Sequence, residues 1–307
     1  MNHTSNQPTS LSDLSHMFGR LQHRPRVAVV SPHDSHTQQV VDRCLRDRLA
    51  EFTLICSRPD SWADEIALQH GDCVTVCQTP DQDAAAARAV EEVRAGRADV
   101  VMKGEINTDN LLRAVLNKEH GLLPAGKVLT HLTAAEIPSY RKLLFFSDAA
   151  VIPQPGLEQM QAIIAYDTRI LRRLGINPIK VATIHFTEKV NEKFPHTLYY
   201  KTLSEEAAEG KYGEGVEIDG PMDVKSACDS HSAEMKHIAG GVPGDADLLL
   251  FPNLVAANTF YKTISCFSGA TMAGMLCGTT APIVIPSRAD SAESKFYSLA
   301  LACIARQ

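Results

Sequence analysis

The segment DADLLLFPNLVAANTFYKTISCFSGATMAGMLCGTTAPIVIPSRADSAESKFYSLAL, residues 245–301, decides the fold of this chain. It alternates an apolar strand, a polar turn, a helix and a second apolar strand, and a further helix ends it. Polar side chains follow both strands: Asn258 and Lys262 come after the first, and Ser287 and Arg288 after the second. In open α/β sheets, ligands bind beyond the carboxyl ends of the strands, where helix N-termini offer unpaired N–H groups. The segment therefore predicts an α/β fold with a site for an anionic ligand.

Toward the N-terminus, the chain repeats strand and helix. Short apolar runs rich in β-branched residues predict strands at 26–31, 52–57, 73–77 and 99–103. Segments with the periodicity of a helix separate these strands. Because continuously apolar strands belong in a parallel sheet that is covered on both faces, we expect doubly wound, mostly parallel sheets.

The pattern changes after residue 116, where the run GLLPAG predicts a turn. Further strands are expected beyond this turn, at 127–132, 142–146 and 149–152. The later apolar run PIVIP returns the chain to the first sheet. We therefore expect two domains with a cleft between them. They are a discontinuous first α/β domain of residues 1–124 and 276–307, and a second α/β domain of residues 125–275.

Composition limits the classes of protein that this chain can represent. Of its 307 residues, 44% are hydrophobic and 21% charged, which is enough for a real core. A net charge of -6 without a basic run argues against nucleic acid or an anionic membrane as a partner. The charge-free run 263–287 contains Ser, Thr and Gly, and it predicts a buried helix followed by a central strand rather than a membrane span. The first ten residues lack the features of a signal peptide, so we expect a cytoplasmic protein.

Cysteine and histidine usage predicts neither disulfides nor a metal centre. The eight cysteines lie mostly in apolar runs without a C-x-x-C pair, which is typical of reduced thiols. Cys73 and Cys77 have the spacing of a metal pair, but CVTVC alternates like a strand, which favours a place in the core. We interpret His33, His131 and His185 as satisfied interior or surface groups. No zinc spacing and no nicotinamide-binding motif occurs, so we expect no metal and no cofactor.

The first candidate site is the segment KGEINTDNLLR, which begins at Lys103. Gly104 permits a close approach of the backbone, and Asn107 and Thr108 supply hydrogen-bonding groups at the start of a predicted helix. Arg113, one turn into this helix, carries a planar guanidinium that suits phosphate oxygens. Alternatively, the residues at the helix start only cap it, and Arg113 is a surface charge.

The second candidate pair is Asn258 and Lys262, which are four residues apart and lie on one face of a predicted helix. Asn258 is equally suited to be the N-cap of that helix, and Lys262 to be a solvated surface lysine. Both interpretations remain open at the level of the sequence.

The third candidate site is SRADSAESK, in which Ser287 and Arg288 directly follow a buried strand. Asp290 and Glu293 have the spacing of an acidic capping box for the last helix, and this role alone would explain both acids. It would not explain Arg288, which needs an anion if it points inward.

These motifs resemble the phosphate acetyltransferase and phosphate butyryltransferase family. The resemblance covers Phe251 through Asn258, Tyr261 and Lys262, then Pro282 and SRADSAESK, and further back KGEINTDNLLRAVL at 103–116. The butyryl branch is the nearer match, because its motif reads much like SRADSAESK and its chains are short.

The resemblance implies a fold, a reaction and partners. The fold is a two-domain α/β type like that of isocitrate and isopropylmalate dehydrogenases, with the site in the interdomain cleft. The reaction is the reversible transfer of a short acyl group, butyryl in the first place, between coenzyme A and inorganic phosphate. The substrates are coenzyme A or acyl-CoA and phosphate or acyl phosphate, no cofactor is needed, and the assembly is a homodimer or larger homo-oligomer.

The resemblance also implies roles for individual residues. Ser287 and Arg288 match the pair at the reacting acyl phosphate, and Arg113 matches an arginine implicated in substrate or phosphate binding. Our hypothesis places Arg288 and Arg113 on phosphate oxygens, with Ser287 donating to the carbonyl oxygen and Lys262 assisting the leaving phosphate. Asn258 matches a further residue of the site region.

The base that deprotonates the coenzyme A thiol is not identified by the resemblance. In the acetyl branch an aspartate near the end of the matching motif is thought to serve, whereas Ser294 stands at that position here. Asp290 or Glu293 could substitute, or the reaction proceeds without a protein base.

Three other functions remain open from the sequence. The first is the same reaction on acetyl groups. The second is a metal- and NAD-dependent hydroxyacid dehydrogenase, which would need clustered aspartate ligands that the sequence does not show. The third is a non-catalytic acyl-CoA-binding protein, an option that the missing aspartate at Ser294 keeps open.

Overall fold

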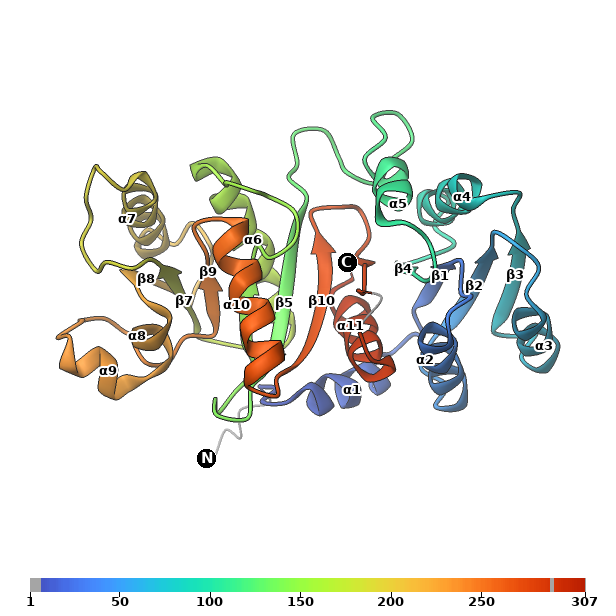
Figure 1. Cartoon of the computed structure of the whole chain (residues 1–307), viewed down its shortest axis with the longest axis horizontal. Coiled ribbons are helices and arrows are strands. Elements are labelled where there is room, and N and C mark those ends of the chain that lie inside the picture. The colour runs from blue at the N-terminus through green and yellow to red at the C-terminus, as the bar shows by residue number, and fades with distance from the viewer. Residues whose placement is uncertain (1–6, 288–289, 307) are drawn as a thin grey trace. The chain divides into compact units, whose positions relative to one another are not determined.

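The computed structural model describes residues 7–287 and 290–306, and the chain divides into two compact units. Unit 1 consists of Met1–Leu11 and Thr130–Met272, and unit 2 of Ser12–Leu129 and Ala273–Gln307. Both units are mixed α/β, with mostly parallel strand pairs, so the predicted fold class is confirmed (Figure 1). In the described part of the chain, no helix is long and apolar enough to cross a membrane.

The strands of unit 2 follow the order β3-β2-β1-β4-β11-β10. Their bounds are β1 Arg26–Val30, β2 Glu51–Cys56, β3 Val74–Gln78, β4 Val100–Lys103, β10 Thr271–Cys277 and β11 Ile283–Val284. The first five in this order are mutually parallel, and β10 is antiparallel to β11. The four N-terminal strands confirm the predicted strands to within two residues, but β10 lies in a run for which we predicted helix before residue 282.

Six helices of unit 2 lie within the described residues: α1 Leu11–Gly19, α2 Ser35–Arg46, α3 Ser61–Gln69, α4 Gln82–Arg94, α5 Thr108–Val115 and α11 Ala292–Ala305. In Figure 1, α2 and α3 lie below the strands and α4 and α5 lie above them. Right-handed crossovers require this arrangement, because the chain moves outward from β1 through β2 to β3 and then returns to the other side of β1. Both faces of the sheet are covered, so β4 is buried along its whole length.

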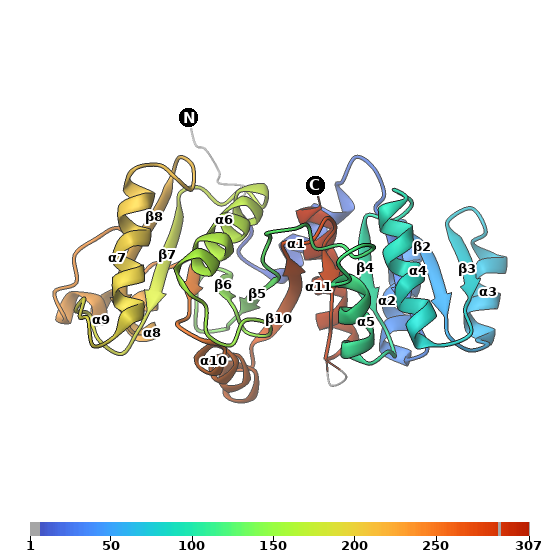
Figure 2. The ribbon, with the colours of Figure 1, turned by 90° about the horizontal axis from the view of Figure 1, so that it is seen from above.

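The strands of unit 1 follow the order β5-β6-β9-β7-β8. Their bounds are β5 Thr130–Glu136, β6 Leu144–Ser147, β7 Ile179–Ile184, β8 Val216–Met222 and β9 Leu248–Leu250. Only β5 is antiparallel to its neighbour in this series. The helices are α6 Leu157–Arg173, α7 Pro195–Ala208, α8 Val224–Cys228, α9 Ser230–Met235 and α10 Leu254–Phe267. Figure 2 shows α6 on one side of β5 and β6 and α10 on the other.

The strand predicted at residues 149–152 is wrong, because a carboxylate organises this backbone instead of a neighbouring strand. Asp148, directly after β6, accepts hydrogen bonds from the backbone N–H groups of Ala150, Val151 and Ile152 at 2.9, 2.9 and 3.1 Å. Three donors on one side chain satisfy the backbone that a sheet would otherwise pair. The chain therefore turns at this point.

A second carboxyl group lies close to this turn but has no such partners. Asp167, on α6, is fully buried, and neither of its carboxyl oxygens has a hydrogen-bond partner in the described part of the chain. Burial raises the pKa of Asp167 well above its usual value, the nearby hydroxyl of Ser147 opposes this only in part, and the charge of Asp148 adds to it. The folded protein therefore holds this group protonated over a pH range in which the unfolded chain releases the proton.

Replacing Asp167 with asparagine is expected to stabilise the protein at neutral pH. Because the pKa is raised in the folded state, stability is fully present below the unfolded pKa of about 4 and is lost as pH rises above it. Asparagine has nearly the same shape and cannot ionise, so the variant should gain about 1–3 kcal/mol at pH 7.5. Thermal melts of both proteins at pH 4.5 and 7.5 test this, since the difference should shrink at the lower pH. A gain that is equal at both pH values would contradict the expected ionisation of Asp167.

Candidate active site

The carboxyl ends of four parallel strands gather at one edge of the sheet in unit 2. Ser31 follows β1, Ser57 follows β2, Gly104 follows β4, and Pro286 lies just beyond β11. The strand order reverses between β1 and β4, because the chain winds from β1 to β2 on one side and returns with β4 on the other. Open α/β sheets bind ligands at such a reversal.

A cavity of about 390 Å³ lies at this edge. Its lining comes from the end of β4, the loops after β1, β4 and β11, and the first turns of α4 and α11, and consists of Asp34, Gln82, Lys103, Gly104, Glu105, Ile106, Asn107, Pro286, Ser287 and Lys295. Three site residues predicted from the sequence, Lys103, Asn107 and Ser287, are therefore brought together by the fold. Asp34, Gln82 and Lys295 also line the cavity and were not predicted.

Lys103 places a buried cation at the base of the cavity. It is the last residue of β4, only 4% exposed, and its Nζ donates to the carbonyl oxygen of Gly104 at 3.2 Å. A lysine removed from water in this way is a strong attractant for an anion, because the surroundings screen its charge weakly.

Gly104 allows the turn after β4 to lie directly on the turn after β1. A β-carbon at this position would lie 2.3 Å from the carbonyl oxygen of Ser31 and 2.9 Å from that of Val30. The backbone N–H groups of Gly104 and Glu105 donate to these two oxygens, at 2.9 Å to Val30 and 2.7 Å to Ser31. The close approach predicted for this glycine thus brings two backbones together at the cavity wall.

The start of α5 forms another part of the wall. The helix begins at Thr108 as predicted, with Asn107 as its N-cap residue. The backbone N–H of Asn107 points to the side-chain oxygen of Gln82 at 3.5 Å, and Gln82 is the first residue of α4. Two helix N-termini therefore meet at the cavity, and their partial positive charges favour a negatively charged ligand.

Lys295 provides the second buried cation of the cavity. Its Nζ donates to Asp34 Oδ1 at 2.6 Å and to Thr37 Oγ1 at 3.3 Å. Burial alone would raise the pKa of Asp34, but hydrogen bonds from Lys295 and Thr37 outweigh this effect and hold the pKa below its ordinary value. The pair ties the last helix, α11, to the first turn of α2.

Replacing Lys295 with methionine is expected to destabilise the protein by roughly 3 kcal/mol, because Asp34 then loses the partner of its charge. The loss should be largest at neutral pH. It should shrink as pH falls below about 4, where Asp34 of the variant gains a proton while wild-type protein loses the stability of its ionised pair. Urea unfolding of wild type and variant, at neutral pH and below about pH 4, measures the difference in their free energies of unfolding.

Lys211 is a control for this change, because its Nζ also pairs with a carboxylate, Glu206, at 2.5 Å, but its side chain is 48% exposed against 5% for Lys295. The Lys211→Met variant should lose no more than about 1 kcal/mol. Equal losses in the two variants would show that burial does not strengthen the pair of Lys295.

The predicted capping box of the last helix is wrong. α11 begins at Ala292 with Ser291 as N-cap, whose hydroxyl accepts from the N–H of Ser294 at 3.1 Å. Asp290 instead closes a tight turn, because its Oδ2 accepts from the backbone N–H of Ser287 at 2.8 Å. Glu293 accepts from the hydroxyl of Tyr297 at 3.2 Å. Asp290 therefore fixes the backbone of Ser287 at the cavity, while the predicted site residue Arg288 lies outside the described residues.

Arg113 does not line the cavity. Its Nη1 lies 3.4 Å from Asp83 Oδ1, and both side chains are exposed. These contacts agree with the alternative interpretation, in which Arg113 is a surface charge.

Asn258 and Lys262 belong to unit 1 and lie inside α10 rather than at its start. Asn253 is the N-cap, since its side chain accepts from the N–H of Ala256 at 2.9 Å, so the prediction of Asn258 as N-cap is wrong. The amide of Asn258 donates to the carbonyl oxygen of Ala149 at 3.0 Å. Lys262 Nζ lies 4.7 Å from the ring centre of Tyr261.

The cavity residues that the sequence did not reveal share one property, which is that their partners are far away in the chain. Asp34 and Lys295 are 261 positions apart. Asp34 could have been recognised as the N-cap of α2, because its side chain accepts from the N–H of Thr37 at 3.0 Å. Lys295 gives a weaker signal, since a lysine four residues into an amphipathic helix is usually solvated.

Comparison with known proteins gives a consistent result for this chain. The model of a family described as Phosphate acetyl/butaryl transferase matches residues 60–303. Phosphate butyryltransferase of Clostridium acetobutylicum is 36% identical over 281 residues, which are 91% of this chain and 92% of that protein. Phosphate acetyltransferase of Thermotoga maritima is 33% identical over 281 residues, which are 91% of this chain and 94% of that protein.

A solved structure agrees with these relatives. The crystal structure of a branched-chain phosphotransacylase from Enterococcus faecalis matches this fold with a TM-score of 0.80 and 26% identity, and the match covers 92% of this chain and 98% of that one. The family match spans most of the chain and includes the cavity residues from Gln82 to Lys295, though not Asp34. The chain therefore belongs to the phosphate acetyl/butyryl transferase family and is an acyltransferase.

Proposed function

We propose that this enzyme transfers a short acyl group, with butyryl preferred, between coenzyme A and inorganic phosphate. Two relatives that cover more than nine-tenths of the chain, from Clostridium acetobutylicum and Bacillus subtilis, carry the name phosphate butyryltransferase or probable phosphate butyryltransferase. The phosphotransacylase from Enterococcus faecalis is described as branched-chain. These names support an acyl group larger than acetyl.

One structural observation carries this proposal. Lys103 and Lys295 are two buried cations that line one cavity together with Ser287 and the N-termini of α4 and α5. Such a group of fixed donors suits a phosphoryl group, whose oxygens need several hydrogen bonds and charge compensation at once. We assign Lys103 to binding of the phosphate oxygens. The sequence indicated Lys103 as a site residue but not the group that it binds.

The proposed reaction needs little more than positioning and charge stabilisation. The thiolate of coenzyme A attacks the carbonyl carbon of the acyl phosphate, a C–S bond forms, and the C–O bond to phosphate breaks. Negative charge develops on the carbonyl oxygen and on the departing phosphate. Ser287 donates to the carbonyl oxygen and Arg288 and Lys103 bind the phosphate, while the roles of Arg113 and Lys262 at phosphate stay predictions from the resemblance.

We further propose that this reaction needs no metal and no organic cofactor, since lysine, arginine and serine provide the donors it requires. Addition of a strong chelator to the assay should therefore leave the rate unchanged. The enzyme is expected to act in the cytoplasm as a homo-oligomer, and its molar mass in solution, measured by light scattering, tests the second expectation.

The experiment that tests the function is thiol release from acetyl-, propionyl- and butyryl-CoA on adding phosphate. We expect phosphate-dependent release that is fastest with butyryl-CoA. The relative from Thermotoga maritima, named phosphate acetyltransferase, supports the second candidate, which is the same reaction on acetyl groups. Faster release from acetyl-CoA would select that candidate, and no release from any of the three would overturn the proposal.

A further inference from the structure

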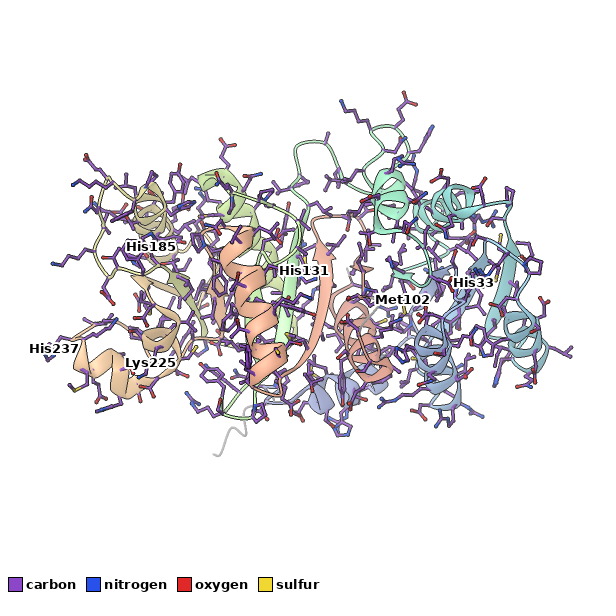
Figure 3. The ribbon with its side chains drawn as sticks, in the orientation of Figure 1. His33, Met102, His131, His185, Lys225 and His237 are labelled. Carbon is purple, nitrogen blue, oxygen red and sulfur yellow. The ribbon has the colours of Figure 1, made fainter. Side chains whose placement is uncertain are left out.

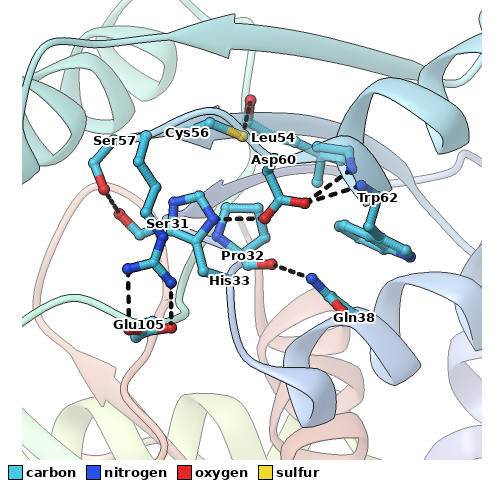
Figure 4. Close-up of polar contacts among 12 residues, drawn as sticks. Ser31, Pro32, His33, Gln38, Leu54, Cys56, Ser57, Asp60, Trp62 and Glu105 are labelled. Atoms are coloured by element: carbon cyan, nitrogen blue, oxygen red, sulfur yellow. Dashed lines mark hydrogen bonds and ion pairs between the residues drawn. The ribbon is translucent and has the colours of Figure 1, made fainter.

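His33 lies in the loop that follows β1, beside the candidate active site (Figures 3 and 4). Its backbone N–H donates to the carbonyl oxygen of Ser31 at 2.8 Å, and the N–H of Glu105 donates to the same oxygen at 2.7 Å. Glu105 lines the cavity, and so does Asp34, the next residue after His33. One carbonyl oxygen therefore joins the loop of His33 to the wall of the cavity.

A carboxylate fixes the orientation of the His33 ring. The ring Nδ1 lies 2.6 Å from Asp60 Oδ2, and the side chain of His33 is only 2% exposed. The other oxygen of Asp60 accepts from the backbone N–H groups of Trp62 and Ala63, at 3.1 and 3.3 Å, as the N-cap of α3. Because the N-terminus of α3 holds one oxygen of Asp60, the other oxygen is positioned to accept a hydrogen from Nδ1 of the ring.

The remaining nitrogen of this ring, Nε2, is buried and has no hydrogen-bond partner in the described part of the chain. An unsatisfied buried polar atom is costly, and such exceptions concentrate at functional sites. With the hydrogen on Nδ1, Nε2 carries the lone pair of a base. The prediction that His33 is a satisfied interior group is therefore wrong for this nitrogen.

An ion pair bridges the strand ends on either side of His33. Arg58 follows β2, Glu105 follows β4, and β1 lies between these two strands. The guanidinium of Arg58 contacts both carboxylate oxygens of Glu105, at 3.3 and 3.0 Å, and both side chains are about half exposed. Arg58 therefore places a group that can bind a substrate phosphate, in competition with Glu105, beside the loop of His33.

We propose that His33 is the base that takes the proton from the coenzyme A thiol, with Asp60 as the residue that positions it. This inference rests on the proposed acyl transfer. A thiol with a pKa of about 8.5 is mostly protonated at neutral pH, so a base is useful there. His33 Nε2 accepts the thiol proton, the sulfur attacks the acyl carbon, and phosphate leaves with the bonding electron pair. The imidazolium then returns its proton to the phosphate, which balances the reaction.

The acidic groups near the cavity, which are the alternatives to His33 as the base, already have partners of their own. Asp34 pairs with Lys295, and Glu105 pairs with Arg58. Asp290, one of the two acids named from the sequence as a substitute base, accepts the N–H of Ser287, and the other, Glu293, accepts the hydroxyl of Tyr297. The charged groups around the His33 loop from neighbouring elements are Asp60, Arg58, Glu105, Lys103, Asp34 and Lys295.

The pH dependence of the variant His33→Gln tests the role of His33. Formation of butyryl-CoA from butyryl phosphate and coenzyme A is measured from about pH 6 to 10, and kcat of the variant should be lower by about 100- to 10,000-fold at pH 7. The defect should shrink as pH rises through about 8.5, because the thiol then ionises without help. Added imidazole should partly restore the rate of His33→Ala. His120→Gln, which changes an exposed histidine, should match wild type at every pH.

Further outcomes separate the possible causes of a failure. A defect of the same size at every pH, or no defect at all, would overturn the role of His33 as base. If His33→Gln does not fold, Asp60→Asn takes its place, and its loss of kcat should likewise shrink at high pH with an unchanged KM for coenzyme A. A wild-type protein that forms no acyl-CoA from any acyl phosphate would instead refute the acyl transfer itself.

Discussion

Replacing Ser287 with alanine is expected to lower kcat for phosphate-dependent release of coenzyme A about 100- to 1000-fold. Ser287 lines the cavity directly after β11, and Asp290 Oδ2 holds its backbone N–H at 2.8 Å. In the proposed reaction, its hydroxyl is the donor for the oxygen on which charge develops in the transition state. Because this bond strengthens only as the charge develops, kcat should fall while the KM for phosphate changes little.

Ser204→Ala is a suitable control for the loss of a serine hydroxyl. The hydroxyl of Ser204 donates to the carbonyl oxygen of Tyr200 in its own helix at 3.0 Å, in unit 1, and its removal should leave kcat at the wild-type value. Arg288→Ala should reduce kcat by a similar factor to Ser287→Ala, from its place in the family motif. Wild-type rates in both Ser287→Ala and Arg288→Ala would refute the assignment of this motif to the reacting acyl phosphate.

Replacing Gly104 with alanine is expected to lower kcat/KM about 100-fold, because the added methyl group forces apart two backbones at the cavity wall. The new β-carbon would lie 2.3 Å from the carbonyl oxygen of Ser31, a backbone atom that has no free rotation to move away. Lys103 and Glu105, which flank the glycine, would shift with it. The same strain should cost about 1–3 kcal/mol of stability, measured by urea unfolding.

Gly156→Ala distinguishes this strain from a general effect of losing a glycine. Gly156 is the N-cap of α6 with a φ of -78°, and an added β-carbon there has no neighbour within 4 Å. The change should cost at most about 1 kcal/mol, because alanine is a poorer N-cap than glycine, and it should leave kcat/KM unchanged. If Gly104→Ala behaves like this control, the close contact with Ser31 does not hold the cavity wall in place.

Local patterns in the sequence predicted the first sheet well. The runs that became β1, β2, β3 and β4 are short, apolar and β-branched, and this signal depends on neighbouring residues alone. Where two partners compete, local patterns are weaker. The run TMAGMLC contains residues that also favour helices, but its pairing with β11 makes it strand β10, because tertiary contacts override modest propensities.

Cap residues show the same limit. Asn253 and Asn258 are both good N-caps, and the N-cap interpretation that the sequence left open for Asn258 is wrong. The four residues after Asn253 continue the helix, so α10 begins at Leu254 and Asn258 falls one turn inside it. Likewise Ser291 rather than Asp290 caps α11, since a hydroxyl serves this role as well as a carboxylate does.

The sequence by itself determined the α/β class, the alternation of strand and helix in the first sheet, and the two motifs that place the chain in its family. Those features depend on short-range periodicity and on runs of consecutive residues. Only the tertiary structure decided which charged groups meet. Lys295 reaches Asp34 from 261 positions away, and His33 meets Asp60 because parallel strands bring their following loops to one edge. Burial of a nitrogen such as His33 Nε2 depends on packing from several loops at once, and no local pattern carries that information.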